Sequence, residues 1–258
     1  MASKLIQVTD CHLTAPLGTL FRGRDPAVFL SRCLNQAAAR HPEVKALLLT
    51  GDLVHDAPTA YPHLAQLVQN ASTAFAQPAL PVLAIAGNHD VPAELASTLS
   101  TTPGVLAEPV LTLGNWCVIG VNTQRVGSTE GYIDAAELNH LSQRLAATSA
   151  AHILLALHHP PIVIGSAWMD EIRLQNTPAL SACIRGYPIR GMVFGHIHQA
   201  FAAVVDNVTY LGTPSSVLQF KAGAPEFALD TELGGAYRVI HLTDTGQIHS
   251  QVEWVDPT

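Results

Sequence analysis

The sequence predicts an α/β fold in which two β-rich halves form a sandwich with helices on the outer faces. In the first half, short apolar runs alternate with longer amphipathic stretches, a pattern typical of strands alternating with helices. Near the C-terminus, short segments of alternating apolar and polar residues predict antiparallel strands. The chain has 258 residues, of which 48% are hydrophobic and 13% charged, so it can bury a sizeable core.

The first elements follow from apolar runs that are too short for helices. Residues 5–9, 46–50 and 82–86 are continuous apolar segments that end beside Asp or Gly, as expected of strands buried on both faces. Between them, residues 25–39 and 59–77 carry the apolar periodicity of helices. The sequence therefore predicts strands and helices in alternation up to about residue 86.

The later elements begin with a capping box. Asp134 precedes Glu137 by three residues, and Leu138, Leu141 and Leu145 form the buried stripe of the helix that it opens. Strands are expected at residues 153–157, 191–194, 204–205, 208–210, 237–240 and 248–252. The chain has no internal repeat, linker or composition break, so residues 1–258 are expected to form a single domain.

The charge balance limits the class of partner. Thirteen Lys and Arg against 20 Asp and Glu give a formal net charge of −7. Nucleic-acid polymers and anionic membranes need clustered cationic side chains, so neither is an expected partner. The chain also has 13 histidines, which serve either titration near neutral pH or metal binding.

The cysteines and the N-terminus indicate a compartment. Cys11, Cys33, Cys117 and Cys183 are scattered without a CxxC pair, which argues against a disulfide framework. No hydrophobic signal segment follows Met1, and no apolar run approaches membrane-spanning length. The expectation is a cytoplasmic enzyme without an integral membrane segment.

Five short polar clusters each follow a strand-like run. They are Asp10-Cys11-His12, Gly51-Asp52, Gly87-Asn88-His89-Asp90, His158-His159-Pro160 and Gly195-His196-Ile197-His198. Each cluster alone could be a turn with a capping Asp or a buried histidine. In the last cluster, alternation along an extended segment would point both imidazoles to the same side. Five clusters at strand ends predict one site, because loops at that edge of a sheet gather distant residues.

The side chains of these clusters form a mixed oxygen and nitrogen donor set. Carboxylates, one carboxamide and several imidazoles suit Mn²⁺, Fe, Zn²⁺ or Co²⁺. Structural zinc sites use cysteine thiolates, and no thiolate is among the expected ligands. Cys11 is not expected to be a ligand, because Asp10 and His12 flank it and the other donors are hard. The sequence therefore predicts a metal centre rather than a zinc-stabilised fold.

In this order, the clusters resemble the calcineurin-like metallophosphoesterases. The resemblance implies a metallophosphoesterase-type β-sandwich of two mixed sheets flanked by helices, with four layers in the order α/β/β/α. It implies two divalent metal ions per chain, with iron and manganese favoured and zinc or cobalt as alternatives. The implied ligands are Asp10, His12 and His198 for one ion, Asn88, His158 and His196 for the other, and Asp52 as the bridge. His89 corresponds to the family's catalytic histidine, and Asp90 is expected to orient its neighbours.

A narrower similarity extends to the bacterial class III cyclic-AMP phosphodiesterases. It rests on the segments around His158, Trp168 and His196 and on residues 213–220 and 227–230. It implies hydrolysis of 3′,5′-cyclic AMP to 5′-AMP by a metal-bridging hydroxide, with His89 protonating the leaving oxygen. Two alternatives stay open: a phosphodiesterase for a 2′,3′-cyclic nucleotide or a glycerophosphodiester, and a non-catalytic regulatory protein with the same fold. A homodimer also stays open.

Substrate contacts are the least specific expectation. The resemblance and the residue types suggest His12, Asn88, His89, His159, Trp168, His198 and Thr213. Residues 164–170 lack a strong period and are expected to form a loop that makes one wall of the pocket. Trp168 in that loop could stack on a purine or anchor the core. Ser215 and Ser216 could donate hydrogen bonds or form a turn. Asn122 occupies a position where many relatives have Asp, so its role stays open.

Overall fold

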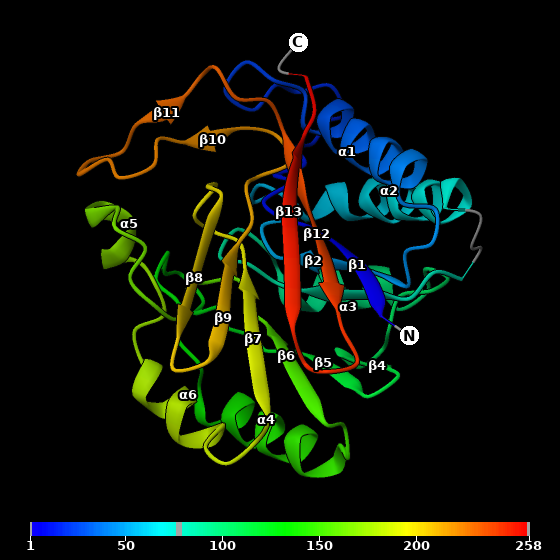
Figure 1. The fold of residues 1–258 in the computed structure, drawn as a ribbon. Helices are drawn as coiled ribbons and strands as arrows, with labels where there is room; N and C mark the ends of the chain where they lie inside the picture. The colour runs from blue at the N-terminus through cyan, green and yellow to red at the C-terminus, as the bar shows by residue number, and fades with distance from the viewer. Residues whose placement is uncertain (1, 76–78, 257–258) are drawn as a thin grey trace.

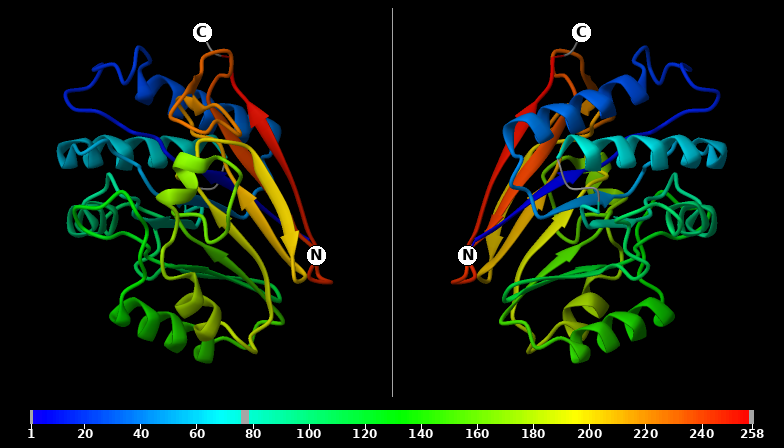
Figure 2. Two further views of the ribbon diagram at one scale, coloured as in Figure 1. Left: turned by 90° about the vertical axis from the view of Figure 1, so that its left-hand side faces the viewer. Right: turned by 90° about the vertical axis from the view of Figure 1, so that its right-hand side faces the viewer.

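The computed structural model describes residues 2–75 and 79–256. Two mixed β-sheets pack face to face, and helices cover the outer face of each sheet (Figures 1 and 2). The layers therefore follow the order α/β/β/α that the sequence predicts, and the first sheet combines strands from both ends of the chain.

The first sheet combines three N-terminal strands with the two C-terminal strands. Its order is β13 (Ile248–Trp254), β12 (Ala236–Leu242), β1 (Ser3–Val8), β2 (Ala46–Thr50) and β3 (Val82–Ile85). The strands β1, β2 and β3 are parallel, and Ile6 lies opposite both Leu47 and Val239. The connections that cover this sheet are α1 (Pro26–Arg40), α2 (Tyr61–Ala74), entered through the 3₁₀ turn Pro58–Ala60, and α3 (Pro92–Leu99). Parallel strands need such crossovers, which place helices on one face.

The second sheet holds the middle of the chain. Its order is β4 (Val110–Leu113), β5 (Trp116–Gly120), β6 (His152–Ala156), β7 (Ile189–Phe194), β9 (Val208–Gly212) and β8 (Phe201–Val205). Helices α4 (Ala135–Ala147) and α6 (Thr177–Cys183) cover its outer face, and the short helix α5 (Ala167–Glu171) lies near the hairpin of β10 (Gln219–Phe220) and β11 (Leu229–Asp230) (Figure 1). The four strands β5, β6, β7 and β9 are parallel to one another, and β4 and β8 pair antiparallel at the two edges.

Both sheets bury both of their faces, so apolar side chains fill one layer between the sheets and one layer under the helices of each sheet. Leu5, Leu48, Val118 and Leu154 lie between the two sheets, together with Ile240. The outer faces carry the alternate residues: Ile6, Leu47 and Leu49 pack under α1 and α2, and Ile119, Ile153 and Leu155 pack under α4 and α6. Alternation of side chains along each strand therefore explains why these runs are apolar at every position.

Most of the predicted elements are confirmed within a few residues. Asp25 caps α1 by accepting from the amides of Ala27 and Val28, and Asp134 caps α4 by accepting from the amide of Glu137 at 2.8 Å. The carboxylate of Glu137 accepts instead from the amide of Asn122 and from Arg144. The predicted helix at residues 59–77 begins at Tyr61 and is described to Ala74, and its last predicted residue, Gln77, lies outside the described residues.

The sequence interpretation left α3, β4, β5, α5, α6, β10 and β11 unassigned. The loop predicted at residues 164–170 is wrong in part, because α5 begins at Ala167. Asp170 accepts hydrogen bonds from the amides of Ile164 and Gly165, which closes a turn against the helix.

Two further expectations can be compared with the described chain. The four cysteines are free, in agreement with the absence of a disulfide framework. Among the residues that the structure describes, none of the helices has the length and apolar character needed to cross a membrane.

Candidate functional site

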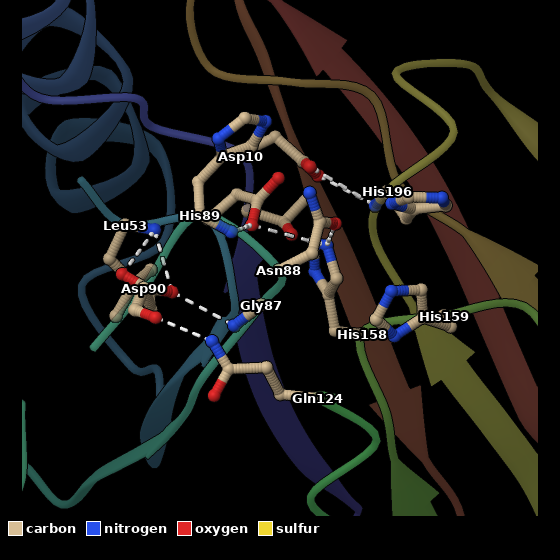
Figure 3. Close-up of polar contacts among 12 residues, drawn as sticks. Asp10, Leu53, Gly87, Asn88, His89, Asp90, Gln124, His158, His159 and His196 are labelled. Atoms are coloured by element: carbon tan, nitrogen blue, oxygen red, sulfur yellow. Dashed lines mark hydrogen bonds and ion pairs between the residues drawn. The ribbon is translucent and has the colours of Figure 1, made fainter. Parts of the chain in front are cut away.

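Five loops converge at one edge of the sandwich. The loops follow β1, β2 and β3 of the first sheet and β6 and β7 of the second, at the carboxyl ends of strands that run parallel within each sheet. Figure 3 shows Asp10, Asn88, His158 and His196 directed toward one another from these loops. The five polar clusters of the sequence are thus brought into one place.

One group of donors is formed by Asp10, His12 and His198. All three are buried, and their ligand atoms lie within 4.8 Å of one another. Nε2 of His198 lies 3.3 Å from Oδ1 of Asp10 and 3.2 Å from Nε2 of His12. The three residues that the resemblance assigns to one metal ion are therefore close enough to share a cation.

The second group contains Asp52, Asn88, His158 and His196. Nε2 of His158 lies 3.4 Å from Oδ1 of Asp52 and 3.2 Å from Oδ1 of Asn88. The other carboxylate oxygen of Asp52 lies 3.8 Å from Nε2 of His12, which belongs to the first group. Asp52 therefore lies between the two groups, where the sequence interpretation placed the bridge.

The ionisation states follow from burial and from pairing. Burial alone would raise the pKa of Asp52, but the nearby His158 outweighs it and holds the pKa well below 3.8. Burial alone would lower the pKa of His158, but the negative charge of Asp52 prevails and raises the pKa of His158 to about 9. Burial and the charge of His158 lower the pKa of His196 to about 3. A metal ion would therefore meet ionised carboxylates and neutral His196, and would displace the proton of His158.

The free nitrogen atoms fit metal binding. Nδ1 of His158 lies 2.8 Å from the carbonyl oxygen of Thr50, and Nδ1 of His198 lies 2.9 Å from that of Leu218. These contacts use the Nδ1–H groups and leave Nε2 of both rings as the lone-pair donor. Nε2 of His196 is buried and has no hydrogen-bond partner in the described chain. Buried carboxylates and imidazoles with unused donor atoms suit two divalent cations of the manganese, iron and zinc type.

The loop backbones are strained at the donor residues. Asp10, His12, Asp52, His196 and His198 all have positive φ, between 46° and 68°, which is uncommon for residues other than glycine. Such strain clusters at functional sites, where the surrounding structure enforces it. The strain indicates that the loops are built to direct these five side chains.

The extended segment predicted for residues 195–198 is wrong. The amide of Ile197 donates to the carbonyl of Gly195 at 2.8 Å, so the chain turns tightly between the two histidines. As a result, His196 faces His158, with ring centroids 5.1 Å apart, and His198 faces His12 at the same distance. The turn directs the two imidazoles to different donor groups, whereas an extended strand would have directed them to one.

Two glycines allow the loops to approach one another. A Cβ atom at Gly51 would collide with the ring of His158, and one at Gly87 would collide with the backbone and carboxylate of Asp52. Gly51 also has a φ of 93°, which L-residues rarely adopt. The glycines therefore provide the close approach that the sequence interpretation expected of them.

Asp90 lies behind the donors and connects two of the loops. Its buried carboxylate accepts hydrogen bonds from the amides of Gly87 and Leu53 (Figure 3). It also accepts from the amide of Val54 and from the hydroxyl of Tyr61. Burial, followed by the charge of Asp52, raises its pKa to about 6 although these donors oppose the shift. Asp90 thus fixes the backbone on either side of the loops that carry Asp52 and Asn88.

His89 lies at the mouth of the site, next to the donors. Its backbone amide donates to Oδ1 of Asp52 at 2.8 Å, and its side-chain Nδ1 donates to Oδ2 of Asp56 at 3.1 Å. The ring of His55 lies 4.6 Å from that of His89, and Nδ1 of His55 lies 3.1 Å from Nδ1 of His12. His89 is therefore oriented by Asp56 and lies beside the candidate metal ligands. It is not itself one of the seven predicted ligands.

A cleft of about 230 Å³ opens over the donor groups. The residues that line it are His12, Phe21, Arg22, Asp52, His55, Asn88, His89, Thr129, Trp168, Met169, Ile172, His196, His198, Phe220 and Phe227. The segment around Trp168 forms a wall of the cleft, as expected. Trp168 also packs edge-on against Phe220 and Phe227. The ring therefore has packing partners and at the same time lines the cleft where a purine could stack.

Some residues singled out in the sequence lie away from this cleft. His159 is buried behind His196, with Nδ1 2.8 Å from the hydroxyl of Thr123, and it is not among the lining residues. Thr213 is fully buried, where it donates to Gln7 and accepts from Arg238. These positions give no support to substrate contacts from His159 or Thr213.

Ser215, Ser216 and Asn122, whose roles the sequence left open, do not line the cleft. The hydroxyl of Ser215 donates to the carbonyl of Asp10 at 2.7 Å, and the hydroxyl of the buried Ser216 has no partner in the described chain. Asn122 is exposed and lines a separate cavity beside α3.

Sequence reasoning assigned no role to Phe21, Arg22, His55, Asp56 or Phe227, although residues 227–230 belong to the narrower similarity. The pair His55-Asp56 follows Asp52 closely, and this proximity was the signal that could have identified it. Phe21 and Arg22 precede a glycine in a segment without periodicity, and no local pattern links them to Phe227.

Comparison with known proteins identifies the family. The model of the family described as calcineurin-like phosphoesterase matches residues 3–200. The chain is 32% identical over 255 residues to a 3′,5′-cyclic adenosine monophosphate phosphodiesterase, CpdA, of Pseudomonas aeruginosa, covering 98% of this chain and 90% of that protein. It is also 32% identical over 253 residues to a 3′,5′-cyclic-nucleotide phosphodiesterase of Nostoc sp., covering 97% and 92% of the two chains.

Solved structures show the same fold at low identity. A dimetal phosphatase from Danio rerio superposes with a TM-score of 0.62 at 12% identity, covering 93% of this chain and 95% of that chain. GAP50, described as the anchor in the inner membrane complex of Plasmodium, superposes with a TM-score of 0.59 at 12% identity, covering 99% and 85%. Because a phosphatase and an anchor share the fold, the fold alone does not establish catalysis. The family model and the full-length similarity together show that this chain belongs to the calcineurin-like phosphoesterases.

Proposed function

We propose that the protein hydrolyses 3′,5′-cyclic AMP to 5′-AMP with two divalent metal ions. The observation that carries the proposal is the convergence of a complete donor set on one small cleft. Asp10, His12 and His198 would hold one ion, Asn88, His158 and His196 the other, and Asp52 would contact both. The similarity to proteins described as cyclic-nucleotide phosphodiesterases over nearly the whole chain supports the choice of substrate.

The reaction requires a proton at the leaving oxygen. Water adds to phosphorus, the bond between phosphorus and O3′ breaks, and one proton of the water ends on O3′. Two bound divalent cations supply Lewis-acid polarisation of the phosphoryl oxygens and lower the pKa of a water molecule. His89 is the proposed proton donor to O3′ because it lines the cleft beside Asp52 and is not needed as a ligand. Asp56 accepts from Nδ1 of His89 and thereby leaves Nε2 for the substrate.

The donor set also limits the metals. Carboxylate, carboxamide and imidazole groups suit iron and manganese, with zinc or cobalt as the alternatives. The four cysteines are not candidates, since none of them lines the cleft and burial raises the pKa of the Cys11 thiol far above its usual value. Elemental analysis of the purified protein would identify the two ions.

The test is a substrate panel with paired variants. Manganese-loaded protein is assayed against 3′,5′-cyclic AMP, 3′,5′-cyclic GMP, 2′,3′-cyclic AMP, glycerophosphocholine and bis(p-nitrophenyl) phosphate. Asp52→Ala removes a proposed contact to both ions, so it should lower both metal content and turnover. His89→Ala should lower turnover by roughly 10²–10⁴, the usual contribution of a general acid, while both ions stay bound.

Each outcome separates the alternatives. Preferred hydrolysis of 3′,5′-cyclic AMP supports the proposal. Turnover of glycerophosphocholine or 2′,3′-cyclic AMP without 3′,5′-cyclic AMP would replace the substrate but keep the chemistry. No turnover of any diester by protein that carries two ions would favour the non-catalytic alternative. Unchanged turnover in His89→Ala with full metal content would refute its role as the acid.

A further inference from the structure

The wall of the cleft beyond the metal donors is aromatic. The ring of Phe220 stacks on that of His198, with centroids 4.1 Å apart and planes inclined by 14°. Phe227 lies 5.4 Å from Phe220, and Trp168 makes edge contacts with both. Three aromatic rings thus extend from a proposed metal ligand toward the rim of the cleft.

Phe227 is the outermost ring of this wall. Its side chain is 48% exposed although it contacts two other aromatic residues. An apolar ring at the edge of a ligand cleft is unfavourably hydrated in the free protein, and a flat ligand that covers it would remove that cost. The position therefore favours an aromatic ligand group over a polar one.

Arg22 lies across the ring of Phe227. Its guanidinium carbon is 5.0 Å from the ring centroid, within the range of a cation–π contact. Among the described residues that line the cleft, Arg22 is the only Lys or Arg. The guanidinium can stack on a planar ring through one face while its N–H groups remain free to donate.

The turn that carries Arg22 is tightly built. The amide of Phe21 donates to the carbonyl of Arg24 at 2.8 Å, and the amide of Arg24 donates back at 3.1 Å, which leaves Arg22 and Gly23 as a two-residue turn with φ of 49° and 87°. Positive φ at both central positions is the type I′ arrangement. Arg24 also donates to the carbonyl of Val217, two residues before β10. The turn is therefore fixed to the same segment that leads into the aromatic wall.

We propose that Phe227, supported by Trp168 and Phe220 and covered by Arg22, forms a nucleobase subsite for a purine. The inference rests on the proposed function, because it assumes that the diester is a nucleotide. A cyclic nucleotide carries its base one ribose ring away from phosphorus, and the aromatic wall likewise starts at His198 beside the metal donors and ends at Phe227. The base stacks on the exposed part of the Phe227 ring that the guanidinium does not cover, and base–aromatic stacking contributes about 1–3 kcal/mol.

The test measures the contribution of the base separately from catalysis. AMP and ribose 5-phosphate share the sugar and the phosphate and differ in the purine. Each is used as a competitive inhibitor of bis(p-nitrophenyl) phosphate hydrolysis by the manganese-loaded protein. The ratio of the two inhibition constants then reports the base alone. We expect AMP to bind roughly 5- to 150-fold more tightly, the fold-change that corresponds to the stacking free energy.

Variants of Phe227 and Arg22 identify the subsite. Phe227→Leu should bring the ratio near one by weakening AMP, and the matched Phe227→Tyr, which keeps the ring, should retain it. Arg22→Lys keeps the charge but loses the planar stack, so it should reduce the ratio without changing the inhibition constant of ribose 5-phosphate. A thermal unfolding midpoint equal to that of the wild type shows that each variant is folded.

The outcomes distinguish this inference from the proposed function. A wild-type ratio near one, or an unchanged ratio in Phe227→Leu, overturns the subsite even if cyclic AMP is hydrolysed. A large ratio that depends on Phe227 supports the subsite even if the preferred nucleotide is not cyclic AMP. If Arg22→Lys raises the inhibition constants of AMP and ribose 5-phosphate equally, Arg22 contacts the phosphate. That result would overturn its proposed contact with the base.

Discussion

Asp90 offers a direct test of how the loops are held in place. Its carboxylate accepts from three backbone amides and one hydroxyl, and the side chain is 4% exposed. Leu53 and Val54 directly follow Asp52, and Gly87 directly precedes Asn88. Replacing Asp90 with alanine would therefore leave four buried hydrogen-bond donors without an acceptor, at the base of the loops that carry Asp52 and Asn88.

The expected cost follows from the number of donors. An unsatisfied buried donor costs about 1–3 kcal/mol, and water entering the space left by the carboxylate would satisfy some of them. Using the lower end for each of the four donors gives a loss of unfolding free energy of about 4 kcal/mol for Asp90→Ala. Asp90→Asn keeps one acceptor oxygen, so its loss should be about half as large.

The assay is urea unfolding of the wild type, both Asp90 variants and Glu232→Gln, an exposed control. A chelator is present throughout, because bound metal would add its own stabilisation. The manganese affinity of each folded variant is then measured by titration, and Asp90→Ala should bind more weakly because its loops are no longer fixed. A loss below about 1 kcal/mol in Asp90→Ala, similar to that of Glu232→Gln, would refute this account of Asp90.

Two further predictions concern His55 and Glu253. His55→Phe keeps the ring but removes the nitrogen 3.1 Å from Nδ1 of His12, so manganese affinity measured by titration should fall roughly 10- to 100-fold, and His55→Asn should recover part of it. Equal affinity in His55→Phe and wild type would contradict this. Burial alone would raise the pKa of Glu253, but hydrogen bonds from Tyr237 and His41 prevail and lower it from 4.5 to about 2. The ionised carboxylate therefore stabilises the fold above pH 4.5, and this contribution is lost as the pH falls toward 2. The difference in unfolding free energy between wild type and Glu253→Gln should shrink over that window, and a difference that does not change with pH would exclude the pairing as its cause.

The sequence was most informative where local signals agreed. The strand at residues 46–50 was predicted with its observed bounds because five buried residues are apolar or small and Gly51 ends the run. The strand β5, Trp116–Gly120, is equally buried but was left unassigned. Its neighbour β4 has four residues of mixed burial and α5 is a helix of five residues, so neither has the continuous buried apolar run that marked residues 46–50.

The seven predicted ligands lie together because each one follows a strand in a recognisable motif. Their backbone conformations were less predictable. The pair His196 and His198 was expected on an extended segment, but a local turn with positive φ at both residues directs them to different donor groups. Such strain is imposed by the packing of the whole site, so the local sequence favours the wrong conformation.

The substrate side of the cleft could not be predicted for a different reason. Arg22 belongs to a hairpin turn before α1 and Phe227 to the segment before β11, and only the fold brings the two residues together. Arg22 has no periodic or motif context, and Phe227 lies in the stretch 227–230 of the narrower similarity, which does not indicate a stacking role. A metal centre needs particular donor types at fixed positions, so it leaves a motif, whereas a stacking surface needs only flat apolar area and can be assembled from any loops that reach the cleft. The proposed metal ligands of this chain could therefore be predicted from its sequence, whereas the proposed substrate contacts depend on residues that only the fold brings together.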